Sequence, residues 1–404
     1  MNDSPTGRPF DPSAAEVDAA ATASAFRIPV VTVQRAFADL PPSHSTQRAN
    51  LHARLELLFD HVVLREPPPD DETRWIRHTL SGREVMLSQP LTFTPYASVM
   101  PCSARCRFCS ETLVDSTMDG PMGAALRPGV DYFNGLRRAL EALRDIPLSY
   151  SLSGLESTDD PDWLMKLLET LACPAGSGPR IEGSVLYTNG AGFADHAGPL
   201  LSALQAFGLR SIEWSRHHDH AEANQAIMRF RDHERIAGQA TFVTALQRVN
   251  GQIPVKLVCV LQRGGIETPM DIQRYTNWAA SLGVRTVIFR EFSSLPAQYR
   301  ANVTRRYIDH ARVSASNLLA SCLDTSWFLD AHVPLALTRG YYFWNARWIR
   351  RDGLEVVFEA SDYGEMRQQE DTGRIYKLVY FANGNLCAGW QPEQQVLWSA
   401  RANE

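Results

Sequence analysis

The chain has 404 residues, which exceeds the size at which one hydrophobic core stops growing, so one large domain with appendages or two domains are expected. Its 40 basic and 45 acidic residues give a formal net charge of -5, which offers no electrostatic basis for binding nucleic acid or an anionic membrane. No apolar run reaches the roughly 20 residues of a membrane helix and no leader pattern opens the chain, so we expect a cytoplasmic protein with small or neutral partners.

Residues 1–88 are predicted to form an N-terminal arm and a small module. Residues 1 to about 25 are rich in Ala, Ser, Asp and Pro and are expected to be a mobile arm. The segment 25–40 has mixed helical and strand character, and 48–64 repeats apolar residues at helical spacing. The sequence EPPPDD at 66–71 then breaks the chain.

Residues 89–296 alternate short β-branched or aromatic runs with longer amphipathic runs. This pattern is typical of parallel strands joined by crossover helices. Helices are predicted over 130–145, 160–172 and 198–208. The fold class is therefore α/β, as a partial, open (β/α)6 TIM-like barrel. Its predicted strands cover 91–96, 148–154, 183–190, 210–215, 255–261 and 286–292.

Residues 297–404 no longer alternate short strand-like runs with helical runs, and they are predicted to form an α+β extension packed on the open side of the barrel. A helical stretch covers 306–323, and Asn383–Gly384 is predicted to be a hairpin turn between two strands. An aromatic set before this turn is expected to be core rather than a stacking platform. This set comprises Tyr341, Tyr342, Phe343, Trp344 and Trp348.

Three of the seven cysteines, Cys102, Cys106 and Cys109, form a C-x3-C-x2-C motif directly after the first predicted barrel strand. Three thiolates on one loop can each hold one iron of a [4Fe–4S] cluster, whose fourth iron then has no protein ligand. An open coordination position lets a metal centre bind a further ligand. The other cysteines stand alone and are expected to be buried structural residues; they are Cys173, Cys259, Cys322 and Cys387.

Three other interpretations of the triplet are open. A structural zinc site would need a fourth Cys or His at a fitting spacing, and none is near in sequence. A closed iron–sulfur electron carrier would need one of the four separate cysteines to fold back as a fourth ligand. The three thiols could also be unligated.

The motif, with Phe108 just before its last cysteine, resembles the signature of the radical SAM superfamily, and the resemblance covers 89–296. It implies a MoaA/PqqE-like core in which S-adenosylmethionine chelates the open iron and the aromatic residue packs near the adenine. The auxiliary-cluster domain of many members is not expected, because only Cys322 and Cys387 follow residue 300. No segment resembles a cobalamin-binding domain.

The resemblance also assigns cofactor contacts at the ends of later strands, where barrel enzymes collect their active-site groups. SGLES resembles the family's Gly-Gly-Glu segment, which meets the methionyl amine, with Ser153 replacing one glycine. YTNG is expected to face the ribose or the substrate, and EWSR to hold ribose hydroxyls and the cofactor carboxylate. Alone, SGLES could equally be a helix cap and TNG a simple turn. The implied contacts are Ser153, Gly154, Glu156, Asn189, Ser215, Arg216 and, near the adenine, Gln262.

Other polar residues near strand ends have weaker assignments. His217, His218 and His220 are expected to be capped, solvated imidazoles, with a second metal site as the alternative. Side chains that could line a substrate cavity, unless strand alternation turns them toward the helices, are Tyr96, Asn189, Glu213, Arg290 and Glu291.

The resemblance implies an enzyme that reductively cleaves S-adenosylmethionine to a 5′-deoxyadenosyl radical, which abstracts hydrogen from a small-molecule substrate. A one-electron donor such as flavodoxin or ferredoxin is then an expected partner, and neither nucleic acid nor a membrane is. A peptide-modifying radical SAM enzyme is the enzymatic alternative. A non-catalytic iron–sulfur or zinc protein is the other.

Overall fold

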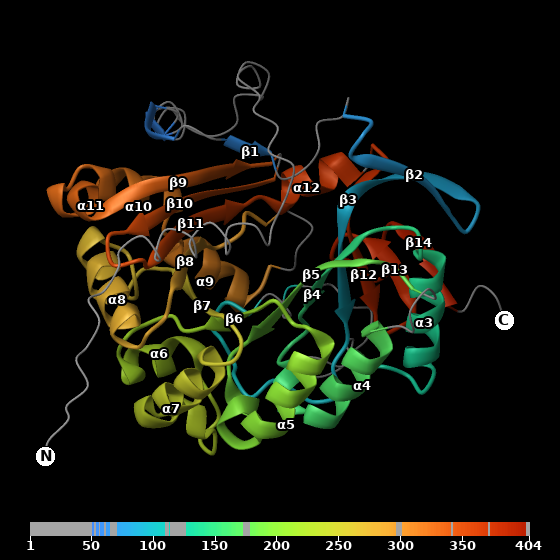
Figure 1. Ribbon diagram of the computed structural model, residues 1–404, viewed down its shortest axis with the longest axis horizontal. Helices are drawn as coiled ribbons and strands as arrows, with labels where there is room; N and C mark the ends of the chain where they lie inside the picture. The colour runs from blue at the N-terminus through green and yellow to red at the C-terminus, as the bar shows by residue number, and fades with distance from the viewer. Residues whose placement is uncertain are drawn as a thin grey trace, which may run out of the picture.

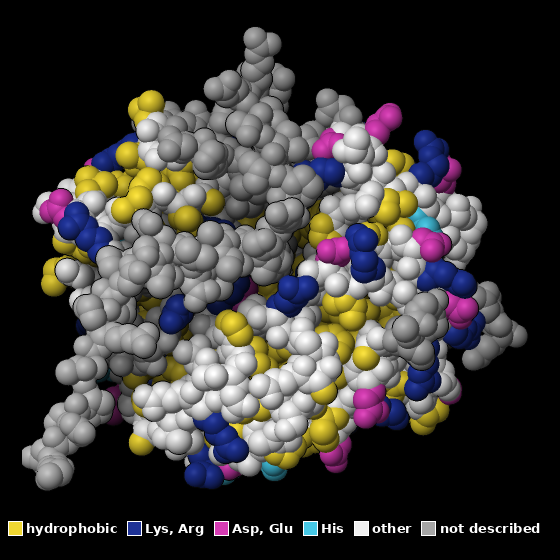
Figure 2. Space-filling view, viewed as in Figure 1, with side chains coloured by type: hydrophobic (Ala, Val, Ile, Leu, Met, Phe, Trp, Pro, Cys, Tyr) yellow, Lys and Arg dark blue, Asp and Glu magenta, His cyan; other side chains and the backbone are white. Residues whose placement is uncertain are grey.

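The computed structural model describes residues 51, 54–55, 57–59, 62–64, 71–109, 113, 127–172, 178–295, 301–340, 342–370 and 372–400 (Figure 1). The predicted arm at 1–25, the mixed segment at 25–40, Cys173 and Tyr341 lie outside these residues. No helix in this part of the chain combines the length and the apolar character that crossing a bilayer requires. On the face shown in Figure 2, basic and acidic side chains are interspersed rather than gathered into one patch.

A run of parallel strands forms the centre of one large mixed sheet. All six predicted barrel strands are found, and each pairs in parallel with the next along the chain. The sheet ends at β1 (Val62–Leu64) and β14 (Val396–Ser399), so it does not close within the described residues. The six strands are β3 (Arg83–Tyr96), β4 (Leu148–Leu152), β5 (Ile181–Thr188), β6 (Ser211–Ser215), β7 (Val255–Leu261) and β8 (Thr286–Glu291).

Amphipathic helices connect these strands and cover one face of the sheet (Figure 1). Asp160 caps α4 by accepting a hydrogen bond from the Trp163 amide at 2.9 Å. The helix predicted to start at Gly198 starts earlier, at Ala191, and has a kink at His196, ahead of Pro199. The connecting helices are α3 (Tyr132–Ala142), α4 (Pro161–Ala172), α5 (Ala191–Phe207), α6 (Ala221–Met228), α7 (Gln239–Asn250) and α8 (Pro269–Ser281).

The C-terminal extension adds strands to both edges of the parallel run, whereas we expected it to pack on one open side. β11 (Glu355–Ser361) pairs in parallel with β8, and β12 (Arg374–Phe381) pairs in parallel with β3. β10 (Phe343–Arg350) and β9 (His332–Arg339) continue antiparallel beyond β11. β13 (Asn385–Ala388) and β14 continue antiparallel beyond β12, so the predicted hairpin at Asn383–Gly384 is confirmed.

The described part of the N-terminal module shares the main core rather than forming its own. Leu51, Leu55 and Phe59 are buried in the main cluster, and the Phe59 ring lies 5.0 Å from Trp348. Trp348 and Trp344 are also buried there, which confirms their predicted role as core. β2 (Trp75–Leu80) pairs with β3, and β1 pairs with β9. The remaining helices are α9 (Val303–Ala311), α10 (Ala315–Leu323), α11 (Ser326–Ala331) and α12 (Tyr363–Glu370).

Candidate functional site

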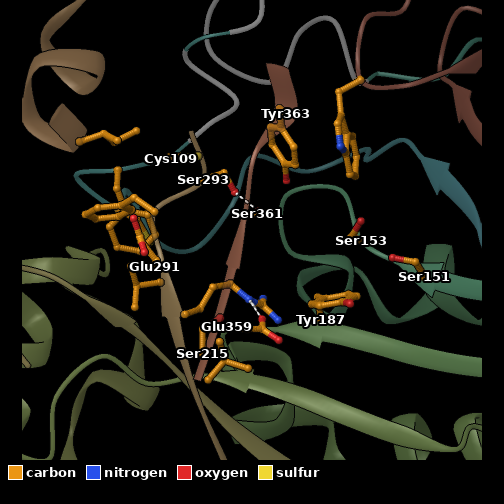
Figure 3. A pocket seen from close by; sticks show the side chains of 18 of the residues that line it. Cys109, Ser151, Ser153, Tyr187, Ser215, Glu291, Ser293, Glu359, Ser361 and Tyr363 are labelled. Atoms are coloured by element: carbon orange, nitrogen blue, oxygen red, sulfur yellow. Dashed lines mark hydrogen bonds and ion pairs between the residues drawn. The ribbon is translucent and has the colours of Figure 1, made fainter. Parts of the chain in front are cut away.

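A cavity of about 490 Å³ lies at the carboxyl ends of the parallel strands. Its walls come from the loop after β3, from the ends of β4 to β8, and from β11 and β12 of the C-terminal extension. Parallel strands bring their carboxyl ends to one edge, so residues far apart in sequence meet here. Figure 3 shows side chains from several of these strands pointing toward the same space.

The loop that carries Cys102, Cys106 and Cys109 is fastened to the end of α6. The amides of Arg105 and Arg107 donate to the carbonyls of Met228 and Ile227, at 3.0 and 3.2 Å. Carbonyls in the last turn of a helix have no partner within the helix, so these bonds satisfy groups that would otherwise need water. All three cysteines line the cavity.

Glu156 ties the end of β4 to the end of β5. Its carboxylate is 3% exposed and accepts four hydrogen bonds. The donors are the amide and hydroxyl of Thr158, the hydroxyl of Thr188 and the amide of Asn189, at 2.5 to 3.1 Å. Burial raises the pKa of Glu156, and these donors oppose that rise. Both carboxylate oxygens are therefore engaged within the protein, although Glu156 borders the cavity.

Asn189 points at the cysteine loop. Its Oδ1 accepts from the Ala191 amide at 2.9 Å, which fixes the orientation of the side-chain amide. Nδ2 then donates to Ser103 Oγ at 2.9 Å and approaches Cys102 Sγ at 3.6 Å. We expected this side chain to face the ribose or the substrate; it borders the cavity but is directed toward the cysteines.

A second acid, Asp159, holds the same loop. Its Oδ2 accepts a hydrogen bond from the Ser103 amide at 2.6 Å. Burial and the neighbouring Glu156 raise the pKa of Asp159 to about 8. The cysteine loop is thus held by Asp159, Asn189 and the end of α6, independently of any bound group.

The thiols of Cys102, Cys106 and Cys109 are the kind of ligand that an iron–sulfur cluster needs, but they are not yet arranged around one point. Burial raises the pKa of Cys102 and of Cys106 well above the ordinary thiol value. Among the described residues no three His, Cys, Asp or Glu side chains are gathered as a metal site. Ligation would require the thiols to lose their protons and turn toward one point. The amides of Ala104 and Asn189, at 3.4 and 3.6 Å from Cys102 Sγ, would stabilise the resulting thiolate.

The separate cysteines are buried as predicted, with the exception of Cys173, which is not described. Cys259, Cys322 and Cys387 are each 0% exposed, and none of them lines the cavity. Within the described residues no fourth cysteine accompanies the triplet, so the donor set fits an open cluster better than a closed one.

Nine of the eleven residues predicted for the site line the cavity: Cys102, Cys106, Phe108, Cys109, Ser153, Gly154, Glu156, Asn189 and Ser215.

Arg216 is not at the cavity, contrary to its predicted role. Its guanidinium lies 4.4 Å from the Phe242 ring centroid and donates to Gln239 Oε1 at 2.6 Å, within the helix layer. Ser215 lines the cavity, and successive side chains of a strand point to opposite faces of the sheet. The side chain of Arg216 therefore points away from the cavity, toward the helices. Burial lowers the pKa of Arg216 to about 10.

Gln262 is the second predicted contact that does not line the cavity. It is 0% exposed, and its Oε1 accepts a hydrogen bond from the Tyr307 hydroxyl at 2.6 Å. The side chain thus joins β7 to α9. It does not reach the space where a ligand would bind.

His217 is a cavity residue and not a solvated imidazole as expected. It is 2% exposed, and its ring centroid lies 5.0 Å from that of Phe108. Nδ1 accepts from the Val260 amide at 3.0 Å, so the neutral ring carries its proton on Nε2. Burial lowers its pKa to about 3, with Arg216 and Arg290 adding to the effect. His220, in contrast, has 67% of its side chain exposed.

The wall from β8, β11 and β12 was only partly predicted. Tyr96, Arg290 and Glu291 line the cavity, whereas Glu213 does not line it but bonds to Arg290. Sequence reasoning assigned Tyr342 and Phe343 to the core and did not consider the other C-terminal lining residues, because nothing in a single sequence says which sheet edge an added strand will join. These lining residues include Tyr342, Phe343, Glu359, Ser361, Tyr363, Lys377 and Trp390.

No family model and no curated protein sequence matches this chain. Similar solved structures include SuiB of Streptococcus suis bound to S-adenosylmethionine, at 12% identity and a TM-score of 0.45, covering 77% of this chain and 63% of SuiB. Coproporphyrinogen III oxidase HemN of Escherichia coli, a radical SAM enzyme, has 13% identity and a TM-score of 0.38, covering 61% and 53%. The enzyme anSMEcpe with bound AdoMet has 13% identity and a TM-score of 0.39, covering 50% and 51%. The chain thus spans less than two thirds of each of these structures.

Proposed function

We propose that this protein is a radical SAM enzyme that binds a [4Fe–4S] cluster through Cys102, Cys106 and Cys109 and acts on a small molecule. One observation carries the proposal. The cysteine triplet follows the first of six consecutive parallel strands and lines the cavity at their carboxyl ends. Catalytic groups of barrel enzymes gather at that end.

When bound, the cluster would supply the electron that splits S-adenosylmethionine into methionine and a 5′-deoxyadenosyl radical, which takes hydrogen from the substrate. The protein's own residues hold and orient the loop that carries the cysteines. Asp159 and Asn189 fix the cysteine loop, and Glu156 fixes Asn189 through its backbone amide. Glu156 is therefore proposed as a positioning residue, because its oxygens are already occupied.

The proposed cofactor pocket adjoins the cysteine loop. The rings of Phe108 and His217 meet edge to face and form an aromatic wall against which an adenine ring could pack. The Nε2–H of His217 could donate a hydrogen bond to the same ring. Gly154, which lines the cavity, has a φ of 127°, and a Cβ at this position would lie 3.4 Å from the backbone N and O of Ala97. Ser153 and Ser215 add hydroxyl groups for polar parts of the cofactor.

The remaining parts of the proposal concern partners and organisation. A flavodoxin or ferredoxin would deliver the electron, and the protein would act in the cytoplasm.

We propose an N-terminal arm and module at 1–88, a barrel at 89–296 and an extension at 297–404. Up to β8 each parallel strand pairs with the next along the chain, whereas the strands after β8 join both edges of this run, which supports the last boundary.

The test is anaerobic reconstitution of the full chain with iron and sulfide, followed by dithionite and S-adenosylmethionine. We expect absorption near 400 nm, about four irons per chain and release of 5′-deoxyadenosine measured by mass spectrometry. A tetrahedral zinc detected by X-ray absorption, or a filled cluster that releases no 5′-deoxyadenosine, would instead support a non-catalytic metal protein.

A further inference from the structure

An ion-pair network at the cavity has no part in the cofactor chemistry described above. Arg290 on β8 and Glu359 on β11 are register partners, and Arg290 Nε donates to Glu359 Oε1. Arg290 Nη2 donates to Glu213 Oε2 on β6 at 2.9 Å. The three side chains therefore span the interior of the sheet from β6 to β11.

Two members of the network, Arg290 and Glu359, line the cavity and keep polar atoms that the network does not use. Arg290 Nη1 and Glu359 Oε2 have no hydrogen-bond partner among the residues that the structure describes. The side chains keep 32% and 8% exposure, and both line the cavity. In Figure 3, Glu359 lies with Tyr187 and Ser215 at one end of the drawn site. A cation and an anion, side by side, thus face the same space.

Charge decides which ligand suits this pair. One guanidinium beside two carboxylates leaves a formal charge of -1, so a ligand that is only anionic is disfavoured. Taking the pair out of water costs free energy that only further charge-assisted hydrogen bonds offset. A neutral ligand with a carboxylate beside an ammonium offers one partner to Arg290 and one to Glu359. An internal residue of a peptide has neither charge.

The opposite end of the cavity is aromatic. Trp390 lies 5.3 Å from Tyr96 and 6.5 Å from Tyr363, measured between ring centroids, and all three line the cavity. Figure 3 shows Tyr363 at the end away from Glu359. Lys377, which also lines the cavity, places its Nζ 3.4 Å from the Trp390 ring centroid. A wall of rings beside one cation favours a flat aromatic group, through burial, ring–ring contact and cation–π attraction.

We propose that the cavity binds a free α-amino acid with an aromatic side chain. Its carboxylate accepts from Arg290 Nη1, its ammonium donates to Glu359 Oε2, and its ring packs against Tyr96 and Trp390. The inference rests on the proposed function and deepens it by naming the substrate class.

The test compares three probes that differ only in their charged groups. Calorimetry on the reconstituted full chain, with saturating S-adenosylmethionine and no reductant, measures the binding of L-tryptophan, tryptamine and indole-3-propionate. Tryptamine lacks the carboxylate and indole-3-propionate lacks the ammonium. Each loss leaves one charged protein group without its partner, so we expect both analogues to bind at least about 10-fold more weakly than L-tryptophan.

A variant separates the two contacts. Glu359→Gln should remove most of the preference for L-tryptophan over indole-3-propionate and keep the preference over tryptamine. Glu84→Gln, the same change at an exposed ion pair on β3, is the matched control and should leave all three affinities unchanged. The probe series on the unaltered protein does not depend on the variant's folding.

The outcomes distinguish the two proposals. Equal affinities for the three probes, or no binding of L-tryptophan by protein that releases 5′-deoxyadenosine, would overturn the substrate assignment and leave the proposed function standing. Protein that takes up no cluster and releases no 5′-deoxyadenosine would overturn the proposed function, on which the assignment rests.

Discussion

The two sides of the cavity are held together by different forces. On the cysteine side, Glu156, Asp159 and Asn189 use their polar atoms on backbone amides and hydroxyls of neighbouring strand ends. On the far side, Arg290 and Glu359 pair with each other and keep one polar atom each for the cavity. The first arrangement fixes a loop, and the second leaves charge available to a ligand.

This difference assigns a task to each side. Saturated hydrogen bonds suit a cofactor that must occupy one position in every turnover, since they hold in place the loop that carries its ligands. Unsaturated charges suit a molecule that enters and leaves, because its binding replaces water at those atoms. The comparison predicts that substitutions on the cysteine side affect cluster retention and stability, whereas those on the far side affect substrate affinity.

The largest expected effect is at the cysteines. Cys102→Ala, Cys106→Ala or Cys109→Ala should each reduce bound iron and abolish 5′-deoxyadenosine release, because two thiolates do not retain the cluster. Iron analysis and mass spectrometry measure both. Cys322→Ala, in the core and away from the cavity, is the control and should keep its iron. A triplet variant with normal iron and normal nucleoside release would refute the ligand assignment.

The next effect is at Glu156. Glu156→Ala leaves buried donors on Thr158, Thr188 and Asn189 without an acceptor, so the free energy of unfolding should fall by about 3 kcal/mol. Urea denaturation of the cluster-free protein measures this change in the free energy of unfolding. Glu84→Ala, at an exposed ion pair, should cost under about 1 kcal/mol. Equal losses in the two variants would show that Glu156 does not fasten the strand ends.

The smallest effect is the pH dependence caused by His217. Its pKa of about 3 in the folded protein lies below the ordinary 6.5, so the folded state binds fewer protons than the unfolded state. This contribution to stability is present above pH 6.5 and is lost as the pH falls toward 3. Each pH unit within that range costs up to about 1.4 kcal/mol.

The measurement is urea denaturation at pH 6.5 and pH 5. The unaltered protein should lose about 1.6 kcal/mol more than His217→Gln over this interval. Asp159 has the opposite dependence, since its pKa is raised to about 8, but it is common to both proteins and cancels in the difference. The exposed His220→Gln should behave like the unaltered protein. Identical pH profiles for His217→Gln and the unaltered protein would show that His217 is not buried in the neutral form.

The sequence predicted the parallel strands well because each is a short run rich in β-branched, aromatic or other apolar residues with a clear break after it. Residues directly after those strands, such as Cys102 and Asn189, could be placed at the cavity for the same reason. Arg216 was misplaced because one step along a strand reverses the side-chain direction. Gln262 was misplaced because its side chain bonds to Tyr307 of α9, a contact that the sequence does not reveal. Glu359 and Trp390 could not be predicted, since their position depends on which sheet edge the C-terminal strands join.

The pairing of β11 with β8 and of β12 with β3 affects how the protein must be made. A ribosome completes residues 83–291 before either outer strand exists, so β3 and β8 first present open rows of amides and carbonyls. Both rims of the cavity are then unfinished. A fragment ending near residue 296 should therefore aggregate rather than serve as a minimal enzyme, and iron loading should follow translation of residues 297–404.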